Sequence, residues 1–229
     1  MSGSFAANRA DVRSLPRWHR LAYIARALPL GIEDLARDLP PAERVLDYGC
    51  AEMPYRGLFP ATADYLAADL PGNPRATVQI AADGTVPVPD GSCDVVVSTQ
   101  VLEHVEHPGT YLSECFRVLR PGGRLLLTTH GMMVWHPDPV DFWRWTCEGL
   151  RRVVGEAGFD VRRFEGIMGL GATGLQFFQD AVLWKLPRPA QPPVALVMQA
   201  LIGLVDRLQG DESKRMNALV FGLVAERPA

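Results

Sequence analysis

Short apolar runs that end on an acidic residue mark the first half of the chain. One run begins at Val45 and stops at Asp47, and a second run, residues 65–68, stops at Asp69. This is the pattern of buried strands that end in tight turns. The carboxyl ends of parallel strands meet at one rim of a sheet, which is where open α/β sheets bind ligands. The pattern therefore predicts that both acids face a ligand at that rim.

Strand-like and helix-like stretches alternate along the rest of the chain. Apolar runs predict strands over residues 76–80, 93–98, 124–129, 159–164 and 218–225. Helical spacing predicts helices over residues 54–59, 108–119 and 146–157. Residues 18–39 also show helical spacing, but Pro29 and Gly31 interrupt it, which predicts two short helices. This alternation favours the α/β class, with a right-handed doubly wound sheet.

A helical insertion is predicted at residues 167–210, before the last strand. It contains a strongly apolar stretch, then the proline-rich residues 187–193, then a second apolar helix over residues 194–208. Neither apolar stretch reaches the ~20 residues that a membrane-spanning helix needs. Three interpretations compete: a cover over the substrate pocket, a dimer surface, and a membrane-surface patch, for which basic residues are sparse.

Length, charge and cysteine usage narrow the class of protein. The 229 residues form one domain, residues 43–229, preceded by a helical segment, residues 1–42. The net charge of −3 provides no overall attraction to nucleic acid, so no such partner is expected. The four cysteines form no C-x-x-C pair, and the N-terminus lacks the apolar core of a signal peptide. We therefore expect reduced thiols in a cytoplasmic protein.

The residues after the first strand indicate what the rim binds. Pro54 stands where a dinucleotide-binding loop needs its third glycine, and Glu52 would repel a phosphate. A ligand with ribose hydroxyls and a cationic amino-acid end would instead suit Asp47, Glu52 and Asp69. S-adenosylmethionine is such a ligand.

Five motifs, in order, resemble the class I S-adenosylmethionine-dependent methyltransferases, and in particular the type 11 group. The first is Val-Leu-Asp-Tyr-Gly-Cys-Ala at residues 45–51, and the others lie at residues 67–69, 83–98, 101–105 and 119–123. Ala51 replaces the usual second loop glycine of the family, which narrows the space near the methionine moiety. The resemblance implies a Rossmann-like sheet of seven strands, with an antiparallel last strand beside the fifth.

The same resemblance assigns the cofactor contacts. It implies that Asp69 accepts hydrogen bonds from both ribose hydroxyls and that Asp83 meets the adenine edge, with a solvated loop carboxylate as the weaker alternative for Asp83. The remaining expected cofactor residues are Asp47, Gly49 and Ala51 at the methionine end, together with Leu70, Gly84, Gln100 and Val101. In this family the segment before the first strand often folds over the pocket, so residues 1–42 form either a lid or part of the core.

Acceptor chemistry is expected from residues 130–146, which hold three tryptophans, two histidines, two acids and an arginine. His130 and His136 are the candidate general bases, because imidazole titrates near working pH. Asp141 and Arg144 either contact substrate or lock the loop onto the next helix. No cluster has metal-ligand spacing, so no metal is predicted. The expected substrate-binding residues are His104, Trp135, Asp141, Trp143 and Arg144.

The sequence thus predicts an enzyme that transfers a methyl group from S-adenosylmethionine to a small molecule, at a hydroxyl of a sugar, a glycan or a secondary metabolite. The transfer is an in-line displacement, so the protein supplies orientation and proton removal and no covalent nucleophile. One alternative is a lipid or quinone-like substrate received by the apolar insertion. Another is a protein that binds the cofactor without catalysis. A second copy of the chain is a candidate partner, and stable membrane insertion is not expected.

Overall fold

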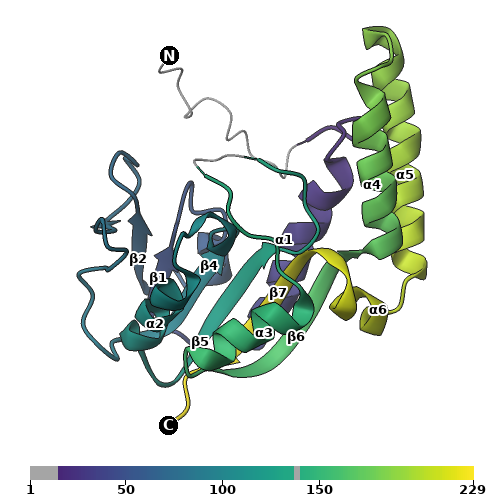
Figure 1. Ribbon diagram of the computed structural model, residues 1–229. Helices are drawn as coiled ribbons and strands as arrows, with labels where there is room; N and C mark the ends of the chain where they lie inside the picture. The colour runs from purple at the N-terminus through teal and green to yellow at the C-terminus, as the bar shows by residue number, and fades with distance from the viewer. Residues whose placement is uncertain (1–14, 137–139) are drawn as a thin grey trace.

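A seven-stranded sheet in the order β3-β2-β1-β4-β5-β7-β6 forms the centre of the computed structural model (Figure 1). The structure describes residues 15–136 and 140–229. β7 is antiparallel to both of its neighbours, β5 and β6, whereas the other paired strands are parallel. The predicted Rossmann-like sheet with an antiparallel last strand is confirmed. The strands are β1 (Arg44–Tyr48), β2 (Asp64–Asp69), β3 (Val78–Gln79), β4 (Cys93–Thr99), β5 (Leu119–His130), β6 (Asp160–Gly169) and β7 (Ala218–Glu226).

Helices cover both faces of the sheet, which is why its central strands are apolar throughout. On one face, Val96 of β4 packs with Leu112 of α2 (Pro108–Val118) and Leu150 of α3 (Cys147–Glu156). On the other face, Val95 and Val97 pack with α1 (Ala22–Ala36). Successive side chains of a strand point to opposite faces, so a β-branched run is buried on both sides. All four cysteines are free thiols, as expected.

The prediction of two short helices before the first strand was wrong, because α1 continues through Pro29. Proline removes one backbone hydrogen bond, but Ile32 and Leu35, beyond it, are buried against the sheet and hold the second half in place. Gly31 allows a close approach, since a Cβ there would lie 2.6 Å from Cδ1 of Ile167.

The helix predicted over residues 54–59 was also wrong, because only one 3-10 turn, Arg56–Leu58, forms there. The Arg56 guanidinium donates to the carbonyl oxygens of Phe59, Pro60 and Ala61, at 3.2, 3.0 and 3.2 Å. These bonds satisfy the end of the turn, and Pro60 prevents its continuation. The chain therefore reaches β2 by a compact loop.

The insertion forms a helical hairpin that extends past the sheet (Figure 1). It consists of α4 (Leu170–Leu183), the short turn η5 (Arg188–Ala190) and α5 (Gln191–Leu208), and α6 (Asp211–Met216) returns the chain to β7. β6 and α5 are both longer than predicted. α5 begins at Gln191 because prolines are tolerated in a first helical turn. Within the described ranges, no helix is long and apolar enough to cross a bilayer.

Candidate active site

A cavity of about 830 Å³ opens at the carboxyl ends of β1, β2 and β4. Parallel strands of an open α/β sheet bind ligands at this rim. All of the predicted cofactor residues except Asp47 line the cavity, namely Gly49, Ala51, Asp69, Leu70, Asp83, Gly84, Gln100 and Val101. The volume lies within the range of small-molecule sites.

Left-handed backbone conformations shape the wall near β1 and β4. Gly49 has a φ of 89°, and a Cβ there would lie 2.5 Å from Cγ2 of Val101. Ala51 and Gln100 also have positive φ angles, 46° and 57°, which cost energy for residues with a side chain. Such strained conformations persist only where the surrounding structure holds them in place. Here they allow the backbones of the loops after β1 and β4 to line the same cavity.

Asp69, at the end of β2, ties the two adjoining loops together. Its Oδ2 accepts from the backbone N–H of Ala51 at 3.0 Å and from Nδ2 of Asn73 at 2.6 Å, and its Oδ1 accepts from the N–H of Leu70 at 2.8 Å. A carboxylate offers about four acceptor positions. The Cys50 thiol also contacts Oδ2, at 4.0 Å, so a ligand would bind Oδ1 or would displace the Asn73 side chain from Oδ2.

Asp47 lies beneath the cavity rather than on its wall. The side chain is buried, and its Oδ2 accepts from the Tyr65 hydroxyl at 2.6 Å. Burial raises the Asp47 pKa to about 6, against the opposing effect of that hydrogen bond. The next residue, Tyr48, lines the cavity instead, since neighbouring side chains of a strand point to opposite faces.

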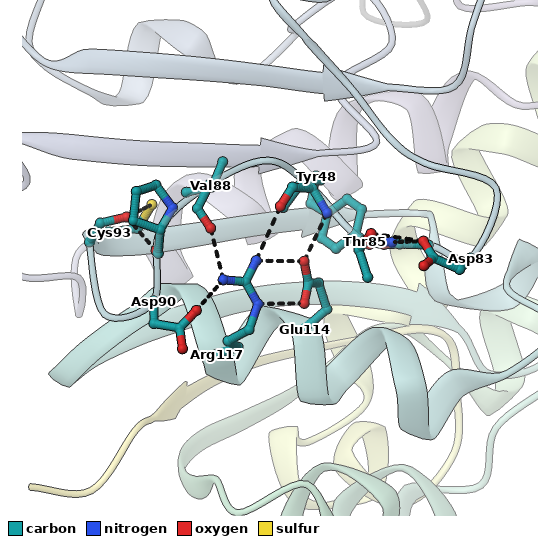
Figure 2. Close-up of polar contacts among 12 residues, drawn as sticks. Tyr48, Asp83, Thr85, Val88, Asp90, Cys93, Glu114 and Arg117 are labelled. Atoms are coloured by element: carbon teal, nitrogen blue, oxygen red, sulfur yellow. Dashed lines mark hydrogen bonds and ion pairs between the residues drawn. The ribbon is translucent and has the colours of Figure 1, made fainter.

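The loop that carries Asp83 is fastened to α2 by one arginine (Figure 2). Arg117 donates to the carbonyl oxygens of Val86 and Val88, at 3.1 and 2.8 Å, and pairs with both oxygens of Glu114 at 2.7 and 2.8 Å. It also contacts the Asp90 carboxylate. These bonds fix the wall of the cavity that faces Asp69.

Asp83 itself lies at the exposed edge of that loop. Its Oδ1 accepts from the backbone N–H and the hydroxyl of Thr85, at 3.0 and 2.8 Å, and these bonds hold the Asp83 pKa below its usual value. The Tyr48 hydroxyl donates to the carbonyl of Gly84. Asp83 is therefore an anionic acceptor at the cavity wall, with a fixed orientation.

Three histidines gather at the opposite end of the cavity. The ring of His136 lies 5.1 Å from that of His104 and 4.7 Å from that of His130, between centroids. His104 and His136 line the cavity. Nδ1 of His104 contacts the carbonyl oxygen of Val140, which can only accept, so Nδ1 carries the proton. This leaves Nε2 of His104 with the lone pair that a base requires.

His130 lies behind the other two histidines and is 3% exposed. Burial lowers its pKa to about 3, with a further contribution from the charge of His136. Its Nε2 lies 3.2 Å from Oε1 of Glu103, a fully buried carboxyl whose pKa burial raises to about 7. Glu103 also accepts from the Thr129 hydroxyl at 2.8 Å. The structure thus places His130 off the cavity wall, facing Glu103.

The aromatic loop after β5 is held by an ion pair. Arg144 donates two bonds of 2.6 Å to the Asp141 carboxylate, which keep the Asp141 pKa well below its usual value. Arg144 also donates to the carbonyls of Met133 and Val134, and Trp143 Nε1 donates to that of Val105 at 2.8 Å. This geometry matches the locking role that the sequence left open for Asp141 and Arg144. Trp135 projects outward, 73% exposed.

Among the described residues, one group has its donor atoms arranged as for a metal ion. One atom each of His130, His136 and Asp141 lies within 4.8 Å of the others. The Arg144 guanidinium already neutralises Asp141 from hydrogen-bond distance. A divalent cation would meet that positive charge at its own ligand, so the arrangement fits a metal poorly.

Several lining residues escaped the sequence reasoning. Tyr111 and His107 line the cavity, and the Tyr111 hydroxyl donates to the carbonyl of Tyr48 at 3.0 Å. Their place on the wall depends on how α2 packs, for which the local pattern carried no signal. Other such residues are Tyr48, Ile80, Thr99, Val140 and Phe142.

The fold and the cavity together are those of a Rossmann-like domain with a small-molecule cavity at the rim where such sheets bind ligands, and Asp69 and Asp83 lie on its wall. Residues 46–127 match the family model described as a methyltransferase domain. This match and the sheet order confirm the methyltransferase resemblance and the fold predicted from the sequence, and they support S-adenosylmethionine as the cofactor.

Two relatives and one solved structure illustrate the likeness. A probable S-adenosylmethionine-dependent methyltransferase of Mycolicibacterium smegmatis is 35% identical over 100 residues, 41% of this chain and 39% of the relative. A ubiquinone biosynthesis O-methyltransferase of Maricaulis maris is 35% identical over 141 residues, 59% of this chain and 46% of the relative. The chain therefore spans less than half the length of these curated relatives. A crystal structure of a SAM-dependent methyltransferase from Aquifex aeolicus superposes with a TM-score of 0.51 at 14% identity, covering 91% of this chain and 98% of that one.

Proposed function

We propose that this protein methylates a hydroxyl of a small molecule, a sugar, glycan or secondary metabolite, with S-adenosylmethionine as donor. The observation that carries the proposal is one cavity whose wall holds Asp69 and Asp83 together with His104 and His136. The acids suit the ribose and adenine of the donor. The imidazoles suit an acceptor whose proton must leave.

The donor is oriented by residues from three loops. Asp69 would accept hydrogen bonds from the ribose hydroxyls, in place of its bond from Asn73, and Asp83 would accept from the adenine amino group. Gly49 and Ala51 let the main chain approach the methionine end, with Gln100 and Val101 alongside. Supplying orientation is the main task of the protein, since the sulfonium already activates the methyl group.

His104 is the proposed base. When bound, S-adenosylmethionine would supply a methyl group that its sulfonium already activates, and Nε2 of His104 would take the proton that the acceptor hydroxyl loses. The bond from Nδ1 to the carbonyl of Val140 holds the required tautomer. His136, at the same wall, is the second candidate base, and His130 is a positioning residue behind it.

A lipid or quinone-like acceptor is the second candidate. Val140 and Phe142 line the cavity and are 46% exposed each, so an apolar acceptor would find apolar side chains at its mouth. The likeness to a ubiquinone biosynthesis O-methyltransferase points the same way. The hydroxyl chemistry is the same for both candidates.

Calorimetry and turnover test the proposal in sequence. S-adenosylhomocysteine should bind the wild-type protein, and Asp69→Ala should weaken that binding at least about tenfold, the equivalent of one charge-assisted hydrogen bond. Release of S-adenosylhomocysteine from S-adenosylmethionine is then followed with a panel of sugars, phenols and long-chain alcohols. His104→Ala should keep the affinity and lose about 10²-fold or more in turnover.

The matched controls are His136→Ala and His19→Ala, the latter outside the cavity. If His104→Ala retained full turnover while His136→Ala lost it, the base would be His136. Cofactor binding with no release for any acceptor would favour the non-catalytic alternative. Undetectable binding of S-adenosylhomocysteine would contradict the proposal altogether.

A further inference from the structure

The α4–α5 hairpin, residues 170–208, turns polar side chains toward the rest of the protein. Gln176, Gln179 and Gln199 are 2–3% exposed, and the Nε2 of each donates to the carbonyl oxygen of Arg20, at 2.8–3.0 Å. Gln199 also accepts from the backbone N–H of Tyr23 at 2.6 Å. A helix that packs on a soluble domain normally buries its apolar stripe instead.

The outer surface of the hairpin is apolar. Along α5, exposed aliphatic residues recur at spacings of three and four, which places them on one face of the helix. Leu204, Val197 and Leu208 on this face are 55, 67 and 78% exposed. α4 exposes Leu170, Phe178 and Trp184. The hairpin therefore buries its three glutamines beside Ala172 and Ile202 and leaves a large apolar area exposed to water. The exposed aliphatic residues of α5 at this spacing are Val194, Val197, Leu201, Leu204 and Leu208.

The acidic residues of the hairpin face the rest of the protein, and its exposed charged residues are basic. Over residues 170–208, all of which the structure describes, both acids face inward: Asp180 pairs with Arg20 at 3.1 Å, and Asp206 accepts from the Tyr23 hydroxyl at 2.6 Å. The exposed charged residues of this range are Lys185, Arg188 and Arg207. Every exposed charge on the hairpin is thus positive.

We propose that the hairpin docks on an anionic lipid bilayer, lying in the interface with its apolar side chains among the acyl chains. An apolar helix face with cationic and aromatic residues around it is the composition that binds such surfaces. A second copy of the chain would bring positive charge toward positive charge, and the α5 face lacks the acidic flanking residues of paired helices. An anionic membrane has the opposite sign to the three exposed charges, of which Lys185 and Arg188 lie at the turn of the hairpin and Arg207 at the end of α5.

The rim at which the hairpin leaves the sheet relates the proposed docking to the cavity. β5 and β6 are both antiparallel to β7, so they run in the same direction, and the chain leaves both strands at the same rim of the sheet. The hairpin follows β6, and the aromatic loop with Trp135 and Phe142 follows β5. The hairpin therefore leaves the sheet at the same rim that holds the cavity.

Vesicle flotation with the full chain tests the docking and does not depend on methyl transfer. The wild-type protein should float with vesicles of phosphatidylcholine and phosphatidylglycerol, and much less with phosphatidylcholine alone. Val197→Asp and Leu204→Asp should each lower the bound fraction about tenfold, because a buried aliphatic side chain is replaced by a charge. The double variant Lys185→Glu, Arg188→Glu should remove the preference for the anionic vesicles. Each substitution should weaken binding to them about fivefold or more.

Leu30→Asp, at an exposed leucine of α1, is the matched control and should float like the wild type. Circular dichroism melting reports whether each variant folds, and Leu208→Asp replaces any that does not. No flotation of the wild-type protein with anionic vesicles would overturn the proposal. A dimer by light scattering that Leu201→Asp dissociates, without flotation, would overturn it in favour of a second copy.

Discussion

Glu103 keeps a carboxyl group in an apolar setting, and this should make stability depend on pH. Its pKa is about 7 in the folded protein, against 4.5 for the free side chain. The folded state therefore retains a proton that the unfolded chain loses between those values. The stabilising contribution is complete below about pH 4.5 and is lost as the pH rises through about 7, on the order of 3 kcal/mol in all.

Glu103→Gln cannot ionise, so it isolates this contribution. The difference in unfolding free energy, wild type minus variant, should fall between about pH 4.5 and 7, as measured by urea denaturation at a series of pH values. The unfolding free energy of the wild type alone would not isolate Glu103. The lowered pKa of His130 makes that free energy rise with pH up to about 6.5, opposite to the effect of Glu103. A difference that stays constant with pH would show that Glu103 is not held protonated.

Gly49 combines two constraints that a matched pair of variants can separate. Gly49 and Gly72 both have left-handed backbones, with φ of 89° and 106°, but a Cβ at Gly72 meets nothing within 4 Å. Gly72→Ala should therefore cost about 1 kcal/mol, the backbone term alone. Gly49→Ala should cost about 2–4 kcal/mol, because its Cβ also displaces Val101. Equal losses in denaturant titrations would mean that Val101 moves away freely.

At the scale of elements, Arg117 of α2 determines where the Asp83 loop lies. Arg117→Ala leaves the carbonyls of Val86 and Val88 without this donor and the nearly buried Glu114 without its counter-ion. We expect a loss of roughly 2 kcal/mol in stability, less than for a fully buried pair because Arg117 is 31% exposed. Affinity for S-adenosylhomocysteine should also fall, by calorimetry.

Arg152→Ala provides the control for Arg117→Ala. Arg152 pairs with Glu156 one turn along α3, and its side chain is 80% exposed. Exposed pairs of this kind contribute little, so the variant should unfold and bind as the wild type does. If both arginine variants behaved alike, the loop would be held by something other than the Arg117 bonds.

Strands and helices with an unbroken pattern of buried residues were predictable from the sequence. Where a helix would break or stop was not predictable. The β-branched run Val95–Val97 reads as a strand because both faces are covered. Pro29 reads as a break, yet burial of Ile32 and Leu35 keeps α1 whole, and that packing involves partners far along the chain. The turn at Arg56 illustrates the reverse case, in which side-chain bonds to the following carbonyls replace an expected helix.

At the scale of the whole molecule, the cavity wall with Asp69 and Asp83 was predictable and the arrangement of the histidines was not. Asp69 and Asp83 follow strands within recognisable motifs, so their place depends on local order and topology. The tautomer of His104 depends on Val140, 36 residues away, and the burial of His130 depends on Glu103. Which side of α5 is buried depends on the elements packed against the helix. The spacing of its apolar residues does not show which side that is.

The stability of the whole sheet should depend on its last strand, β7. β7 lies between β5 and β6, and all of its residues except Glu226 are buried. Removal of residues 218–229 would leave two unpaired strand edges and uncover both layers of the core. We expect the truncated chain to lose its cooperative thermal transition and its near-ultraviolet circular dichroism.

Removal of Pro228 and Ala229 alone, both exposed, is the control and should leave the melting curve unchanged. A cooperative transition in the longer truncation would mean that strands β1 to β5 form a stable unit without β7. Because β6 pairs in the sheet only with β7, the α4–α5 hairpin would then be held by its bonds to Arg20 and Tyr23 and no longer through β6. The closure of the sheet and part of the placement of the hairpin thus depend on the same strand.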